Sequence, residues 1–125
     1  MVEYSADSID RAAFQVQQHE ADGAVVIAVS GDVDMVTAPR LAEAIDAAIA
    51  TRPAALIVDL SKVQFLASAG MTVLVTAQAQ VVPPTRFAVV ADGPATSRPI
   101  KLMGIDSTFA LYRTRDTALA GIADE

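Results

Sequence analysis

Two runs made almost entirely of apolar residues constrain the fold of this chain more than any other feature. They are AALIVDL at 54–60 and RFAVVA at 86–91. Neither run alternates between apolar and polar residues, which is typical of strands that are covered on both faces. Between them, SKVQF at 61–65 is predicted to be a link, and the segment from Ser68 to about Val82 is predicted to be a helix that ends before Pro83-Pro84. A buried strand, a helix and a second buried strand predict a parallel sheet with helices packed on it.

The amino-terminal part predicts a hairpin that joins this sheet. Apolar residues alternate with polar ones at Phe14 and Val16, as in a half-buried strand, and AVVIAVS at 24–30 predicts the next strand. The dipeptide Asp22-Gly23 between the two is a strong signal for a tight turn. We therefore expect the first two strands to be antiparallel.

Local signals predict three more helices and a short strand. One helix is expected to be capped by Thr37 and to end at TRP (51–53), with an apolar stripe along one side. A short helix is predicted over about 95–103, stopped by Gly104 in a left-handed conformation. STFALYR at 107–113 is predicted to be a short edge strand, and Thr114 is predicted to cap the last helix. The apolar stripe of the helix that ends at TRP (51–53) consists of Leu41, Ile45, Ala48 and Ile49.

The predicted fold class is therefore α/β. We expect a mixed sheet of four to five strands, covered by about four helices, in the order β-β-α-β-α-β-α-(β)-α. The 125 residues fit one domain, predicted over residues 12–125, after a polar and flexible segment at 1–11.

Composition argues against several classes of function. The chain has no cysteine, so it has no disulfide or thiolate site, and its one histidine, His19, cannot build a metal site alone. A net charge of −6 without a basic patch argues against nucleic acid. No apolar stretch reaches the ~18 residues of a membrane span, and the amino terminus lacks the pattern of a secretory signal. Phosphate-loop and nucleophile-elbow motifs are absent too, so we expect no enzyme and no cofactor. The lack of cysteines and of a secretory signal leads us to expect a cytoplasmic protein.

The segment FLASAGMTV at 65–73 is the best candidate for a functional site. Ser68 opens the predicted helix, where serine is most often an N-cap worth ~1 kcal/mol. A cap does not explain Gly70, because glycine in a helix costs ~1 kcal/mol relative to alanine. Small residues around a hydroxyl indicate that another molecule approaches the backbone here. The spacing alone leaves the cap and the binding site both open.

Three segments in order carry a resemblance to a known family. LIVDLSKVQFLASAGMTVL is similar to the signature of the STAS domain family, the anti-sigma factor antagonists. GDVDMVTAP at 31–39 resembles the family's Gly-[Glu/Asp]-Leu-Asp loop, and KLMGIDSTFALYRTRDTAL resembles its carboxyl-terminal part. The resemblance covers roughly residues 13–122 and implies a STAS-like fold.

The resemblance also implies a function and a site. Such a protein binds an anti-sigma factor with serine-kinase activity, which frees a sigma factor, and phosphorylation of Ser68 ends the association; a phosphatase would reverse it. The family's aspartate before the serine is Ala67 here, which puts phosphotransfer in question. A constitutive adaptor and a small nucleotide- or ligand-binding domain therefore stay open as alternatives, as does the oligomeric state. The predicted partner-binding residues are Asp32, Asp34, Thr37, Ala67, Ser68, Ala69, Gly70, Met71 and Thr72.

Overall fold

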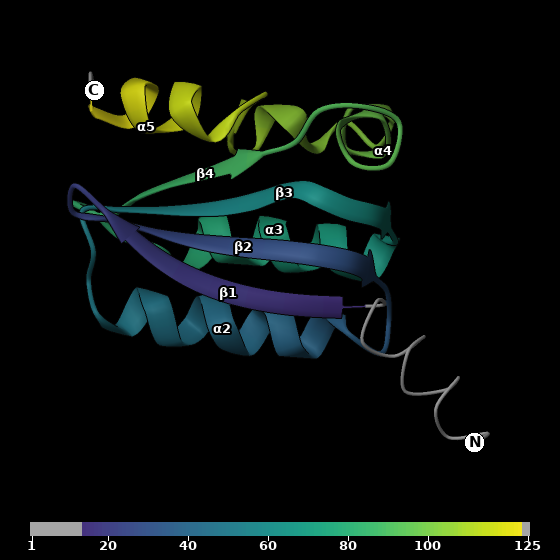
Figure 1. Ribbon diagram of the computed structural model, residues 1–125, viewed down its shortest axis with the longest axis horizontal. Helices are drawn as coiled ribbons and strands as arrows, with labels where there is room; N and C mark the ends of the chain where they lie inside the picture. The colour runs from purple at the N-terminus through teal and green to yellow at the C-terminus, as the bar shows by residue number, and fades with distance from the viewer. Residues whose placement is uncertain (1–13, 124–125) are drawn as a thin grey trace.

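The structure is a computed structural model that describes residues 14–123. It contains one five-stranded sheet in the order β1-β2-β3-β4-β5 (Figure 1). The predicted flexible segment at 1–11 lies outside the described residues. The strands are β1 (Phe14–Ala21), β2 (Ala24–Val33), β3 (Ala55–Leu66), β4 (Arg86–Val90) and β5 (Ala110–Tyr112). The helices are α2 (Ala38–Ala50), α3 (Ser68–Gln80), α4 (Ser97–Leu102), the 3-10 turn η1 (Ile105–Ser107) and α5 (Arg115–Ala123).

The sheet confirms the predicted α/β class and the order of elements. β1 and β2 are antiparallel, whereas the β2–β3, β3–β4 and β4–β5 pairs are all parallel. The hairpin turn has positive φ at both Asp22 (53°) and Gly23 (85°), as a tight type I′ turn requires. The predicted edge strand is β5, at the end of the sheet opposite β1.

Helices cover the two faces of the sheet unequally (Figure 1). The larger core lies between one face and helices α2 and α3, with fully buried Leu41, Ile45 and Leu74 facing Leu56 and Val58. A smaller core lies on the other face, where α5 packs on β4 and on the amino-terminal parts of β2 and β3. No helix within residues 14–123 is long and apolar enough to cross a membrane.

The third strand is longer than the sequence predicts. The link predicted at SKVQF (61–65) belongs to β3, which continues to Leu66. The pairing of β2 with β3 shifts register between Ala28 and Ser30 and again between Gly31 and Asp32. These irregularities interrupt the regular alternation that identifies a strand in a sequence, so the prediction of a link was wrong.

Several helix ends also differ from the predictions. α3 ends at Gln80 rather than at about Val82, and α4 begins at Ser97 rather than at about Ala95. Gly104 does have the predicted left-handed conformation, with φ 74°. The cap predicted for the last helix is also present, because the Thr117 N–H donates to Thr114 Oγ1 at 3.1 Å.

Candidate functional site: the surface around Ser68

Ser68 is the first residue of α3 and its side chain is exposed. Ala67 is the N-cap, because β3 runs to Leu66 and leaves a single residue between strand and helix. The prediction that Ser68 caps the helix is therefore wrong. The Ser68 hydroxyl makes no hydrogen bond to any other residue in the range 14–123. It is a free hydroxyl at a helix start, which a partner or a modifying enzyme can reach.

Gly70 lies in the first turn of α3 and is buried. A Cβ atom added there would lie 2.6 Å from Val33 Cγ1 and 2.7 Å from Leu66 Cδ1. Such distances are too short for carbon atoms, so a larger residue would force Val33 or Leu66 to move, and glycine suits the packing of α3 against the ends of β2 and β3. The expectation that Gly70 leaves the backbone open to another molecule is wrong, because this protein's own core fills that space.

The loop that follows β2 lies next to the start of α3. The Ala67 N–H donates to the Val33 carbonyl at 2.8 Å, which joins the loop at 34–37 to the residue before Ser68. This contact brings together the two segments that the sequence predicts to form the partner-binding surface. Both follow the carboxyl ends of neighbouring strands, where ligands of open α/β sheets commonly bind.

Asp34 and Thr37 hold the loop in shape. The backbone N–H groups of Val36 and Thr37 both donate to Asp34 Oδ1 at 3.0 Å. The Asp34 N–H donates to Thr37 Oγ1 at 2.9 Å, and that hydroxyl donates to the Asp32 carbonyl at 2.9 Å. Thr37 is the N-cap residue of α2, as predicted, but its hydroxyl serves the loop rather than the helix.

These contacts change the acidity of one carboxyl group. The hydrogen bond from the Thr37 backbone, with smaller help from the Val36 backbone and the Thr37 hydroxyl, lowers the pKa of Asp34 from its usual value of 3.8. Asp34 is therefore ionised at neutral pH. Its oxygen Oδ1 is occupied by the loop, so a structural role is the main one that the contacts support.

Exposed apolar side chains around the site were missed by the sequence analysis. Met35 and Val36, at the tip of the loop, are each 79% exposed. Leu102 and Met103, after α4, are 74% and 63% exposed, and Phe65 on β3 is 53% exposed. Large exposed apolar residues that gather near one place indicate a protein-binding surface. The adjacent pairs Met35-Val36 and Leu102-Met103 were visible in the sequence, but pairs of that kind are equally common in cores.

A small apolar groove lies directly beside the Ser68 hydroxyl. Its volume is about 210 Å³. It runs between α3 and the segment that joins α4 to η1, so its two walls come from parts of the chain that are distant in sequence. Met71 and Thr72, which the sequence predicts as contacts, take part in it, and the Thr72 hydroxyl donates to the Ser68 carbonyl at 3.1 Å. The groove is lined by Ser68, Met71, Thr72, Val75, Met103 and Ile105.

The remaining predicted residues have lesser roles. Ala67 and Ala69 are half-buried and flank the hydroxyl, and Asp32 is half-buried at the end of β2. His19 is exposed on β1. Asp59 is buried inside β3, where Ser61 donates a hydrogen bond to it and Arg115 forms an ion pair with it. Among residues 14–123, no three side chains of the metal-binding types come together.

Comparisons with known proteins agree with this arrangement. A family model described as the STAS domain matches residues 14–118, so the chain belongs to the STAS domain family. It is 43% identical over 101 residues to the anti-sigma-F factor antagonist RsfB of Mycobacterium tuberculosis. These aligned residues cover 81% of this chain and 83% of that relative. The resemblance inferred from the three sequence segments is confirmed.

Solved structures extend the comparison. An anti-sigma factor antagonist from Mycobacterium paratuberculosis has a TM-score of 0.87 at 47% identity, over 90% of this chain and 97% of that chain. A Thermotoga maritima protein has a TM-score of 0.79 at 16% identity, over 86% of this chain and 94% of that chain. The second likeness shows the fold alone. The first agrees with RsfB in indicating a regulator rather than an enzyme.

Proposed function

We propose that this protein is an anti-sigma factor antagonist that binds an anti-sigma factor through the surface around Ser68. The observation that carries the proposal is a free, exposed serine hydroxyl beside an apolar groove. The names of two relatives at 43% and 47% identity support the class of partner. Sequestering the anti-sigma factor would release a sigma factor, which implies action in the cytoplasm.

Phosphorylation of Ser68 by a kinase activity of the anti-sigma factor is the proposed switch. The hydroxyl is accessible, and no acidic residue stands in the first turn of α3 to repel a phosphate. A helix start also favours an anion through its N–H groups and dipole. The fold should therefore tolerate phosphoserine at this position, and a phosphatase would restore the free hydroxyl.

The added phosphate would oppose docking. It carries a charge of about −1.5 to −2 at neutral pH and holds water strongly. Beside a groove that must lose its water to bind an apolar side chain, this dianion has to be desolvated or kept at a distance. A loss of only ~3 kcal/mol weakens affinity by more than a hundredfold.

The test is intact-mass measurement after incubation with the anti-sigma factor and Mg-ATP. The proposal requires one added phosphate, its absence in Ser68→Ala, and its presence in Thr72→Ala, which removes the neighbouring exposed hydroxyl. Ser68→Glu should keep the fold but weaken binding to the anti-sigma factor. Tight binding without any phosphate transfer would favour the constitutive adaptor. The presence of Ala67 in place of the family's aspartate also argues for that alternative. Saturable purine-nucleotide binding would instead favour the ligand-binding alternative.

A further inference from the structure

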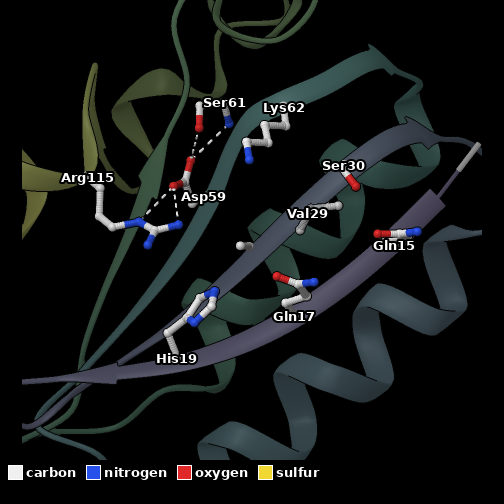
Figure 2. A pocket seen from close by; sticks show the side chains of 10 residues that line it. Gln15, Gln17, His19, Val29, Ser30, Asp59, Ser61, Lys62 and Arg115 are labelled. Carbon is white, nitrogen blue, oxygen red and sulfur yellow. Dashed lines mark hydrogen bonds and ion pairs between the residues drawn. The ribbon is translucent and has the colours of Figure 1, made fainter. Parts of the chain in front are cut away.

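A polar trough of about 360 Å³ lies on the sheet face opposite α2 and α3 (Figure 2). Helix α5 covers only part of that face, over a cluster that includes Val26, Ile57 and Val90. The neighbouring area, over β1, β2 and the middle of β3, carries no helix (Figure 1). The trough shares no lining residue with the groove beside Ser68.

The register of the sheet explains the shape of the trough. Gln17 on β1 pairs with Ala28 on β2, and Ala28 pairs with Asp59 on β3. Ala28 thus provides a shallow floor between two longer polar side chains. By the alternation of a strand, His19 projects to the same side as Gln17, and Figure 2 shows both side chains directed into the same space.

The register shift in β3 turns a lysine toward this space. Ala28 pairs with Asp59, but Ser30, two residues later, pairs with Lys62, three residues later. The extra residue places Lys62 on the same face as Asp59, whereas regular alternation would place it on the opposite face. The Ser61 N–H and hydroxyl donate to Asp59 Oδ1 at 2.9 Å and 2.6 Å, which fixes the irregularity in place.

The charges around the trough are unbalanced. Asp59 has a side chain only 5% exposed, and Arg115 Nη2 and Nε both contact its Oδ2 at 3.0 Å. The Asp59–Arg115 pair is neutral as a unit. Both oxygens of the Asp59 carboxylate already have partners, Oδ1 with Ser61 and Oδ2 with Arg115. Lys62 has no ion-pair partner among residues 14–123. The trough therefore holds one uncompensated positive charge on a chain whose net charge is −6.

We propose that the trough binds a small organic monocarboxylate that carries hydroxyl groups. The carboxylate would pair with the Lys62 ammonium, and its hydroxyl groups would bond to the Gln17 amide, the His19 ring and the Ser30 hydroxyl. A single net positive charge matches a monoanion, whereas the second charge of a phosphate would find no further cation, because Arg115 is already paired with Asp59. This inference does not depend on the proposed switch at Ser68.

The experiment is a titration of the ¹⁵N-labelled protein with D-gluconate, followed by amide chemical shifts. We expect saturable shifts at Lys62, Gln17 and His19 with a Kd on the order of 1 mM, because a polar site with one ion pair binds weakly. Glucose tests whether the carboxylate is needed, and inorganic phosphate tests the preference for a monoanion. Both should bind at least about tenfold more weakly, as expected when ~1.4 kcal/mol is lost.

The chain offers a matched pair of variants, because Lys62 and Lys101 are its only lysines. Lys62→Gln should weaken gluconate binding about tenfold or more, since it removes the charged partner. Lys101→Gln removes the same charge from another exposed position and should leave binding unchanged. Absence of saturable shifts with gluconate at about 20 mM, equal loss in both variants, or tighter binding of phosphate would each overturn the proposal.

Discussion

Gly70→Ala tests whether the small residue in α3 serves the core or a partner. An added Cβ would lie 2.6 Å from Val33 Cγ1 and 3.4 Å from Val33 Cβ. Overpacking of a core costs about 1–3 kcal/mol, and the higher helix propensity of alanine returns at most ~1 kcal/mol. We therefore expect the free energy of unfolding to fall by about 0–2 kcal/mol for alanine and by ~3 kcal/mol or more for Gly70→Val.

A double-mutant cycle with Val33→Ala isolates the cause. Val33 is fully buried, so truncating it alone should cost about 2 kcal/mol through two lost methyl groups and the cavity. In the double variant the alanine Cβ at position 70 occupies part of that cavity. The losses of unfolding free energy in the two single variants should then sum to at least ~1 kcal/mol more than the loss measured in the double variant.

Chemical denaturation of the four proteins measures this coupling, with Ala79→Gly on the exposed side of α3 as the control for helix propensity. That control should lose ~1 kcal/mol with no coupling to Val33→Ala. If Gly70→Ala raised stability by ~1 kcal/mol and instead abolished partner binding, the packing argument would be refuted.

Three other predictions concern the partner groove, the buried ion pair and the loop. Met103→Glu should weaken binding of the anti-sigma factor by ~2 kcal/mol or more in calorimetry without a change in melting temperature, while Val82→Glu, also on an exposed apolar residue, should have no effect on binding. Arg115→Gln should lower the free energy of unfolding by about 1–3 kcal/mol in denaturation at neutral pH, because it leaves the buried Asp59 carboxylate without its cation; the partial exposure of Arg115 reduces the loss. Since hydrogen bonds lower the pKa of Asp34, its contribution to the loop is fully present above pH 3.8 and is lost as the pH falls through the folded-state pKa; NMR shifts of the amides that donate to it should be constant between about pH 5 and 8.

The fold was predictable from the sequence wherever a local residue pattern alone determines the structure. Asp22-Gly23 specified the hairpin because only a turn with two positive φ angles matches the twist of the strands. The continuous apolar runs specified the central strands because helices cover both of their faces there. The second half of β3 was missed because its register shifts are set by pairing with β2, which no local pattern records.

The candidate site was only partly predictable, for a similar reason. The loop at 34–37 and the start of α3 could be matched to family motifs, and the structure places them in contact. The groove wall formed by Met103 and Ile105 comes from a distant part of the chain that only the fold brings to Ser68. The sequence indicated that Gly70 has a reason beyond helix propensity. That reason is close packing against Val33, which lies thirty-seven residues earlier in the sequence.

Ala67 has a consequence for the switch that follows from its place at the N-cap of α3. Its backbone, with φ −83° and ψ 169°, has the extended conformation of an N-cap residue, but a methyl group cannot accept a hydrogen bond. The first N–H groups of the helix therefore have no side-chain acceptor at this position. An aspartate there would fill that role and add a negative charge beside Ser68.

Ala67→Asp should therefore separate stability from switching. In the unmodified protein it should raise the free energy of unfolding by ~1 kcal/mol, because a capping carboxylate is gained. After phosphorylation of Ser68 the gain should shrink or reverse, since the carboxylate and the phosphate then compete for the same N–H groups and repel each other. Thermal unfolding of the two proteins, each with and without phosphate on Ser68, measures both effects, with Ala67→Asn as the uncharged capping control. An equal gain in all phosphorylation states would mean that the phosphate does not interact with the helix start.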